Sequence, residues 1–266
     1  AEPMARYAWL YLRYLGQNIK SLMSYRLSFL VGLAAFMARQ FLGVAFVGLV
    51  FAAIPDLAGW SREEVLFVYG FAQLGRGFDH MFTDNLWILA WRMVAKGEFD
   101  RILVRPLPPL FQLLAERFQT DGIGELVAGI AVTAWAAPRL DFPAGAWTPA
   151  LGAAAVLASI LIYTAVKLAL ASLAFWIKFS QSYLFAAYKM ADFAMYPMNI
   201  YPKALRFVLS WALPFAFTAY YPAAALLGRE SVAFGIGGAL AVGFVAAALS
   251  LLVWRAGLRA YESAGS

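Results

Sequence analysis

The sequence predicts an all-α integral membrane protein, with six transmembrane helices in a single transmembrane domain over residues 1–266. Hydrophobic residues make up 63% of the chain and charged residues 14%, whereas soluble domains are about half apolar and about a quarter charged. Several apolar segments reach the ~20 residues that a helix needs to cross a bilayer. Lysines and arginines gather at the ends of these segments, as they do in membrane proteins.

The sequence also excludes several classes of active site. It contains no cysteine and one histidine, which excludes thiol catalysis, cysteine-bound metals and histidine clusters. It has no G-x-x-x-x-G-K-[ST] phosphate loop and no hydrolase motif. We therefore predict no enzyme activity, no catalytic residue, no metal and no cofactor bound by this chain. Its net charge of +6 lies at span ends, so membrane orientation explains it without a nucleic-acid partner.

The chain is expected to begin with a helix that lies in the membrane interface, over residues 4–26. Arg6, Arg13 and Lys20 share one face of this helix, and aromatic and aliphatic residues fill the rest. A basic, aromatic-rich amphipathic helix is typical of an interfacial position. The alternative is that these residues are the frayed start of the first span.

The spans themselves are marked by apolar runs and by the residues that begin or end them. Ser61 and Glu64 have the spacing of a capping box, which predicts a helix start there. Prolines are tolerated in the first turn of a helix, which allows a span to start at Pro106. The expected spans are residues 27–54, 63–86, 106–137, 150–177 and 232–254, with a sixth between residues 178 and 231.

The segment before the last span does not read as one clean helix, because prolines interrupt it. In one interpretation a span covers residues 179–195, and a re-entrant hairpin broken at Pro214 follows. In the other, residues 179–205 are interfacial and residues 206–227 form the span. A broken helix at membrane depth must be surrounded by protein or line a cavity.

A charged run between the second and third spans is the most unusual stretch of the sequence. It carries both charge signs, a glycine, an embedded phenylalanine and a closing proline, and we interpret it as a docking site. The alternative is a solvated loop that follows the positive-inside rule. We expect a short helix over residues 86–95 and a turn at Lys96–Gly97. The candidate contact residues are Trp91, Arg92, Lys96, Gly97, Glu98, Phe99, Asp100, Arg101 and Arg105.

Charged residues inside the expected spans are costly in a bilayer unless they are paired or wetted. At about 1.5 Å rise per residue, Arg39 and Asp121 lie at similar depths, and Glu116 matches Lys167 or Arg76. We therefore predict these ion pairs, which either lock the helices together or line a polar path. The candidates are Arg39, Arg76, Asp79, Glu116, Asp121 and Lys167, and His80 is expected to be a polar group near the inner interface.

The distribution of basic residues predicts the orientation of the chain. With the first helix on the cytoplasmic side, the inner segments hold most of the Lys and Arg residues and the outer loops hold few. This asymmetry predicts that both termini and the charged run are cytoplasmic.

In this layout the chain resembles the permease subunit of type 2 ABC exporters. More narrowly, it is similar to a small bacterial subfamily with a G-x-F-D-R-x-L-x-R-P loop, which here is Gly97–Pro106. The resemblance covers nearly the whole chain. Companion features are Gly59-Trp60-Ser61, Tyr69-Gly70, Pro214-Phe215-Ala216-Phe217, Tyr221-Pro222-Ala223 and Leu227-Gly228.

The resemblance implies a complex in the bacterial cytoplasmic (inner) membrane. Two permeases pair, as a homodimer or with a sister subunit, and each sits on an ATP-binding subunit that holds ATP and Mg. Residues 87–105 would be the coupling region, with Phe99 as its apolar anchor. Its charged residues would hold the contact or brace the region against the first helix. Residues 201–228 would be a re-entrant hairpin, including Pro214, Phe215, Tyr221 and Pro222.

The function implied by the resemblance is ATP-driven export, by alternating access, of a hydrophobic or amphipathic drug, lipid or glycan. One alternative is an ion-coupled secondary transporter that needs no ATPase and relays protons through Asp79, Glu116 or Asp121. Six spans without a visible repeat argue against that class. A further alternative is a scaffold protein that recruits a soluble partner through the charged run.

Overall fold

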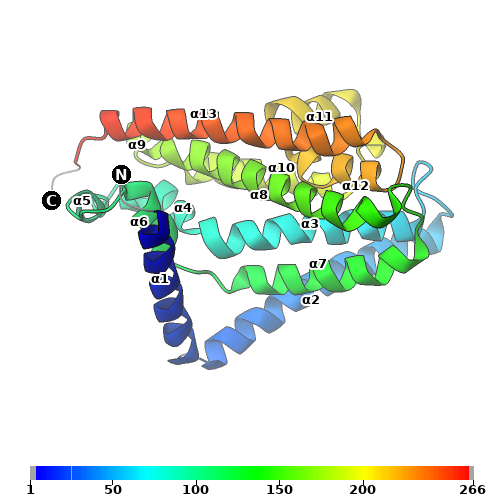
Figure 1. Cartoon of the computed structure of the whole chain (residues 1–266), viewed down its shortest axis with the longest axis horizontal. Helices are drawn as coiled ribbons and strands as arrows, with labels where there is room; N and C mark the ends of the chain where they lie inside the picture. Colours follow the sequence, from blue (N-terminus) through cyan, green and yellow to red (C-terminus); the bar gives the residue numbers. More distant parts are fainter. Residues whose placement is uncertain (1–3, 25, 264–266) are drawn as a thin grey trace.

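A computed structural model describes residues 4–24 and 26–263 of the chain, and the described part contains helices and loops but no strand. Helix α3 lies between α7 and α8, and α13 packs along α8 (Figure 1). Three described segments are long and apolar enough to cross a membrane, namely Leu30–Ala53, Gly145–Ile177 and Ala233–Ala260. The four lengthwise helices are α3 (Arg62–Thr83), α7 (Asp121–Ala136), α8 (Thr148–Ser172) and α13 (Gly238–Ala260).

The bundle has two distinct ends. We call the segment of residues 85–107 the hub, and the end of the bundle where it lies the hub end. The far end carries the loops at residues 54–61, 137–147 and 227–232. Both ends of the described chain lie at the hub end (Figure 1). The hub contains α4 (Asn85–Ile88), the π-helix η1 (Leu89–Met93) and α5 (Asp100–Leu103).

The first two helices lie at the edge of the bundle. Helix α1 (Met4–Ser24) runs steeply across the hub end of the bundle. Helix α2 (Arg26–Ala53) runs diagonally along the bundle from the hub end toward the far end (Figure 1). Tyr7 of α1 lies 5.2 Å from Phe111, measured between ring centroids. Helix α2 leaves large apolar side chains exposed along its length, among them Leu30, Phe41 and Leu49. Such a surface suits contact with lipid or with another membrane helix.

Helix α3 starts at the predicted capping box. The backbone N–H of Glu64 donates to Ser61 Oγ at 3.3 Å, and the N–H of Ser61 donates to Glu64 Oε2 at 2.8 Å. This helix is too polar to be recognised as a span by its hydropathy, yet most of its residues are buried. Its polar groups are therefore enclosed by the protein, which is where polar groups of a membrane protein are tolerated.

Close packing of α3 on α7 depends on glycine. A Cβ atom on Gly77 would lie 2.8 Å from the backbone nitrogen of Leu126, and one on Gly129 would lie 2.9 Å from the carbonyl oxygen of Gly70. Small residues let two helix backbones approach closely, which is a common basis of helix association in membranes.

The expected third span is interrupted, which corrects the prediction of one helix over residues 106–137. Helix α6 (Pro109–Ala115) ends next to Glu116, and α7 begins only at Asp121. In the interruption, the N–H of Gln119 donates to the carbonyl oxygen of Met81 on α3 at 3.1 Å. Because of this break, Glu116 lies beside the hub rather than deep in the bundle.

The order of helices between α8 and α13 agrees with the first of the two interpretations, which placed a helix at residues 179–195 before a broken helical segment. After α9 (Ala174–Ile177), a helical stretch covers residues 181–195, made of α10 (Gln181–Ala191) and η4 (Asp192–Met195). A short turn, η5 (Met198–Ile200), leads to a helical hairpin broken at Leu213–Pro214, so the single helix over residues 206–227 is wrong. The hairpin elements are α11 (Lys203–Phe207), η6 (Val208–Ala212), η7 (Phe215–Thr218) and α12 (Tyr220–Leu226).

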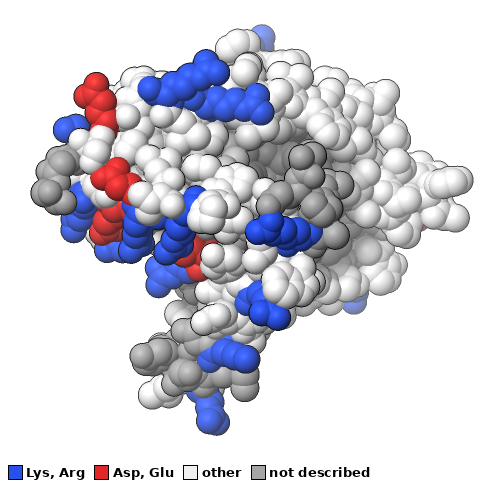
Figure 2. Space-filling model, turned by 60° about the vertical axis from the view of Figure 1, so that its left-hand side comes forward, with Lys and Arg blue, Asp and Glu red and all other residues white. Residues whose placement is uncertain are grey.

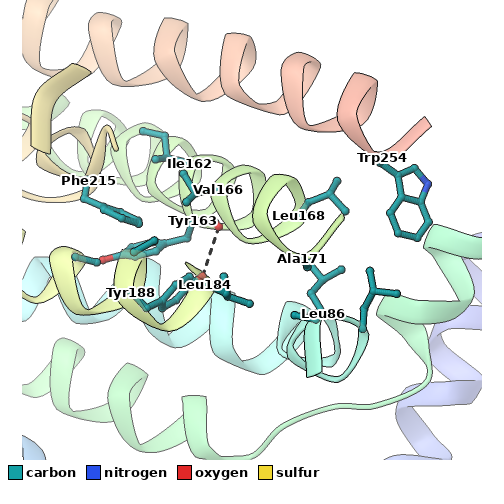
Figure 3. Packing of buried hydrophobic residues seen from close by; sticks show 14 of the residues in the cluster. Leu86, Ile162, Tyr163, Val166, Leu168, Ala171, Leu184, Tyr188, Phe215 and Trp254 are labelled. Atoms are coloured by element: carbon teal, nitrogen blue, oxygen red, sulfur yellow. Dashed lines mark hydrogen bonds between the residues drawn. The ribbon is translucent and has the colours of Figure 1, made fainter. Parts of the chain in front are cut away.

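The two ends of this hairpin are held by one loop at the far end. Asn199 Nδ2 donates to the carbonyl oxygen of Ala58 at 2.9 Å, and Arg229 Nη2 donates to that of Gly59 at 2.8 Å. The broken middle reaches into the core, where Phe215 points toward Tyr163 and Tyr188 (Figure 3). The hairpin therefore enters and leaves the bundle at the same end.

Candidate functional site

The hub is anchored to the bundle by Phe99. Its side chain is completely buried, and its ring meets those of Phe175, Trp254 and Tyr261 edge to face at centroid distances of 5.1, 6.2 and 5.2 Å. These rings come from α9, from α13 and from the residue that follows α13. The expectation that Phe99 inserts into a partner is wrong for this conformation, because its own chain encloses it.

The turn that places Phe99 depends on Gly97, which has a φ of +69°. A glycine takes this left-handed conformation without the cost that a side chain would add. The N–H of Phe99 then donates to the carbonyl oxygen of Met93 at 3.1 Å and closes the turn. The sequence correctly predicted a helix ending in a turn here, although η1 ends at Met93, two residues before the expected position.

The exposed surface of the hub is both apolar and basic. Val104 is 82% exposed, Trp91 49% and Leu103 45%, while Lys96, Arg101 and Arg105 are exposed beside them. Lys and Arg residues cluster at the hub end of the molecule (Figure 2). Exposed apolar residues ringed by charge are typical of protein-binding surfaces.

Two ion pairs, one within the hub and one from the hub to Glu116, brace this surface. Arg92 Nε lies 3.4 Å from Glu98 Oε2, and Arg101 Nη2 lies 3.7 Å from Glu116 Oε1. These contacts are partly exposed, so each contributes little to stability by itself. Their effect is to hold the basic side chains in place at the surface.

Asp100 joins the hub to the segment that follows α13. Its Oδ2 accepts a hydrogen bond from Ser263 Oγ at 2.5 Å, and its Oδ1 accepts one from Tyr261 Oη at 2.8 Å. These two hydrogen bonds hold the pKa of Asp100 below its usual range, because they stabilise the charged form. The ionised contact is therefore present above the ordinary Asp pKa and is lost as the pH falls through the lowered value.

A cluster around Lys167 lies inside the bundle, between α3 and α8. We call Lys167, Asp79, Thr83, Asp84 and Tyr188 the lysine cluster. The ammonium of Lys167 lies 2.8 Å from Asp79 Oδ2, 2.5 Å from Asp84 Oδ1 and 3.0 Å from Thr83 Oγ1. Tyr188 Oη also donates to Asp79 Oδ2, at 2.7 Å. Lys167 and Asp79 are both completely buried, so this contact locks α3 to α8.

A second cluster surrounds Glu125 of α7, whose side chain is also completely buried. We call Glu125, Arg39, Arg76 and His80 the glutamate cluster. Glu125 Oε1 lies 3.0 Å from Arg39 Nη2 and 3.8 Å from Arg76 Nε, and Oε2 lies 2.7 Å from His80 Nδ1. Arg76 Nη1 continues the chain of contacts to Asp192, at 2.6 Å.

The structure corrects the ion pairing predicted for Glu116, and it gives Arg39 a partner that depth alone did not predict. Arg39 pairs with Glu125; Asp121, its expected partner, begins α7, and the side chain of Asp121 lies outside the described part. Glu116 forms an ion pair with Arg101 and not with either of its expected partners, Lys167 and Arg76. Depth along a helix is one coordinate, whereas an ion pair also depends on which helix faces which.

Asp79, His80 and Asp84 bring metal-type ligand atoms within 4.8 Å of one another. In the structure these atoms already have partners. The ammonium of Lys167 lies against both carboxylates, and His80 contacts Glu125 through Nδ1. The charge that a cation would supply there is supplied by the lysine.

The remaining predicted residues are placed as follows. Arg6, Arg13 and Lys20 are exposed on α1, and the guanidinium of Arg13 lies 4.0 Å from the centroid of the Trp9 ring. In the hairpin, Tyr221 Oη lies 2.9 Å from Ser210 Oγ across the break, and Pro222 is buried.

Several important residues were missed as candidates. Leu103 and Val104 carry no sequence signal of their own, yet their exposure makes them the apolar part of the hub surface. Glu125 is one of three carboxylates in the expected span of residues 106–137. Only knowledge of which face of that helix packs against α3 would have singled it out. Nothing local in the sequence links Tyr261 to Asp100, because they are 161 residues apart.

We expect Arg39→Ala to leave folding and assembly nearly unchanged. The Arg39 side chain is 53% exposed, and Glu125 keeps Arg76 and His80 after it is gone, so the buried carboxylate stays paired and the loss should be much smaller than that caused by removing Arg76. If Arg39 lines a transport path, transport stops while the complex remains intact. Thermal unfolding in detergent would measure the first effect, with the buried Arg76→Ala as the strongly destabilising comparison. Equal destabilisation by the two variants would contradict this prediction.

Comparison with protein families identifies the chain. A family model described as ABC-2 family transporter protein matches residues 21–265. Comparison with curated proteins and with solved structures finds no match. Members of the matched family are membrane transport components that work with separate ATP-binding subunits. The chain, with its apolar membrane-length helices, belongs to the ABC-2 transporter family and is a membrane transport permease.

Proposed function

We propose that this chain is the membrane-spanning permease subunit of an ATP-driven exporter in the bacterial cytoplasmic membrane. It crosses the bilayer six times, with the hub end cytoplasmic. The helices proposed to cross are α2, α3, α7, the α8–α9 segment, the α10–η4 segment and the η8–α13 segment, where η8 is Ala233–Gly237. The hairpin of residues 203–226 is re-entrant from the outer side, because both of its ends contact the far-end loop.

The observation that carries this proposal is the surface of the hub. It presents Val104, Leu103 and Trp91 to solvent at the end of a membrane bundle, although apolar side chains gain from being covered. Basic residues surround them, and buried Phe99 fixes the whole surface to α9 and α13. A surface with apolar contacts and a charged rim, fixed to the helices behind it, is suited to receiving movement from a cytoplasmic ATP-binding subunit.

ATP and Mg belong to that partner subunit, and a second permease, either a copy of this chain or a sister subunit, completes the complex. ATP binding draws the partner subunits together, the hubs follow, and the two permeases rock about their interface. The exposed apolar face of α2 is available for lipid or for the second permease.

The substrate is a hydrophobic or amphipathic molecule of the drug, lipid or glycan class. A cavity of about 240 Å³ lies between α2 and the segment before the hairpin, and its lining includes Phe46, Val50, Tyr196 and Tyr201. This lining favours apolar ligands. The buried carboxylates Asp79 and Glu125 already have cationic partners, which disfavours the alternative of a proton-coupled transporter.

The test is a pulldown of the tagged chain from native membranes in gentle detergent, with partners identified by mass spectrometry. We expect a stoichiometric ATP-binding subunit. Val104→Asp should reduce its recovery at least tenfold, because burying an unpaired carboxylate in an apolar contact costs more than the ~1.4 kcal/mol that corresponds to a factor of ten.

The matched control is Val232→Asp at the far end, where the side chain is 43% exposed and precedes η8. An acidic residue is tolerated before a helix, and recovery should equal that of the parent. Unchanged recovery with Val104→Asp would remove the hub from the interface. Recovery of this chain alone, active in vesicles without ATP, would overturn the exporter assignment.

A further inference from the structure

The hub contacts several helices of the bundle, among them α8 and α10. Two further neighbours could carry its movement into the membrane. One is α1, which reaches the hub end through the contact of Tyr7 with Phe111 on α6. The other is α13, together with the segment of residues 261–263 that follows it. The hub contacts α13 and residues 261–263 in two ways, by packing of aromatic rings and by two hydrogen bonds.

The ring packing ties the hub to α13 from within. Phe99 contacts Trp254 of α13 and Tyr261, and Phe175 of α9 contacts both of those rings at 5.3 and 5.8 Å. A Cβ atom on Gly257 would lie 2.4 Å from Phe175, so α13 and α9 are in close contact at this point. A buried cluster of this kind leaves little room for the hub to shift relative to α13.

The hydrogen bonds close over the same place from the outside. Asp100 directs one carboxylate oxygen to Tyr261 and the other to Ser263. Burial and the hydrogen bond to Asp100 raise the pKa of Tyr261 to about 12, so its hydroxyl remains a donor at physiological pH. Hydrogen bonds to a charged acceptor are shorter and stronger than neutral ones.

We propose that residues 261–263 form a latch that makes the hub and α13 one rigid body, with Tyr261 and Asp100 as its positioning residues. The latch directs movement of the hub into the last span rather than into α1. Its role in ATP-driven movement rests on the proposed function, whereas the rigid connection itself does not.

The latch can be tested by distance measurement between spin labels, because the chain has no cysteine of its own. Labels attached through Ala95→Cys in the hub and Arg255→Cys on α13 report on this connection, since both positions are exposed. In the purified complex we expect a narrow distance distribution that does not change with ATP, Mg and vanadate. A change in the parent would show that the hub and α13 do not move as one body.

Tyr261→Phe removes the hydroxyl and keeps the ring, so folding should be retained. We expect the distribution to become at least twofold broader and to shift with ATP. Tyr221→Phe is the matched control, because it also loses a side-chain hydrogen bond, to Ser210, but at the hairpin. The double variant Asp100→Asn with Tyr261→Phe should be at least as broad as Tyr261→Phe alone, because in the single variant the charged Asp100 still accepts a hydrogen bond from Ser263.

Besides a change in the parent, two outcomes with the variants overturn the latch: a distribution for Tyr261→Phe as narrow as that of the parent, or equal broadening by Tyr221→Phe. Thermal unfolding separates the latch from general destabilisation, because Tyr261→Phe should broaden the distribution at a nearly unchanged melting temperature. If no ATP-binding subunit is recovered, the proposed function fails. In that case the widths of the spin-label distance distributions measured without ATP still decide whether the latch exists.

Discussion

Replacing Lys167 with methionine should destabilise the protein by about 3–5 kcal/mol, which is the usual effect of removing one partner from a buried ion pair. Methionine is similar in length but carries no charge, so Asp79 and Asp84 would lose their counter-charge inside the bundle. Many proteins are stable by only about 5–15 kcal/mol. We therefore expect a large fall in the amount of folded protein recovered from membranes.

Thermal unfolding in detergent would measure this effect, with Lys189→Met as control. The Lys189 side chain is 61% exposed and its ion pair with Asp192 is long, at 3.7 Å, so its loss should matter little. Adding Asp79→Asn to Lys167→Met should recover part of the stability, because asparagine removes one buried charge and can still accept from Thr83 or Tyr188. A melting temperature for Lys167→Met equal to that of the parent would show that the lysine cluster does not hold α3 to α8.

Phe99→Ala should also cost about 3–5 kcal/mol, as is usual for removing a buried aromatic ring. The ring lies between Phe175, Trp254 and Tyr261, so its loss leaves a cavity and frees the hub from α13. We expect the permease alone, without any partner, to melt at a lower temperature. Recovery of the ATP-binding subunit should fall as well, because the exposed hub surface would no longer be held in one position.

The change in melting temperature that Phe99→Ala causes in the isolated permease shows whether Phe99 is an internal anchor or a partner contact. A residue that only contacts a partner would leave the melting temperature of the permease alone unchanged. Phe207→Ala is the control, because its side chain is 63% exposed, and it should have little effect on either measurement. If Phe99→Ala lowered partner recovery without affecting the permease alone, Phe99 would be a contact residue after all.

Structural features that depend on residues close together in the sequence were predictable. The capping box at Ser61 and Glu64 depends on residues three apart, and the structure contains both of its hydrogen bonds. The break at Pro214 follows from the missing N–H of proline. The turn at Gly97 follows from a glycine placed after a short helix, since glycine adopts a positive φ at low cost.

The break at residues 116–120 was not predictable in this way. The prolines before it and the apolar residues after it are compatible with one helix, and no local signal stops the helix at Ala115. The backbone hydrogen bond from Gln119 to Met81 replaces a helical one, and it exists only because α3 lies alongside. Packing between neighbouring helices also explains why α3, the most polar of the expected spans, is deeply buried.

By itself the sequence determined that this is a helical membrane protein, where the long helices α1, α2, α3 and α8 start, and that its charged run is unusual. These properties follow from composition, from the length of apolar segments and from local backbone preferences. Only the tertiary structure decided which charges meet and which side of the hub is exposed. Phe99 and Val104 are five residues apart, yet one is enclosed by rings from distant segments and the other faces solvent, because packing between helices sets which side chains are buried.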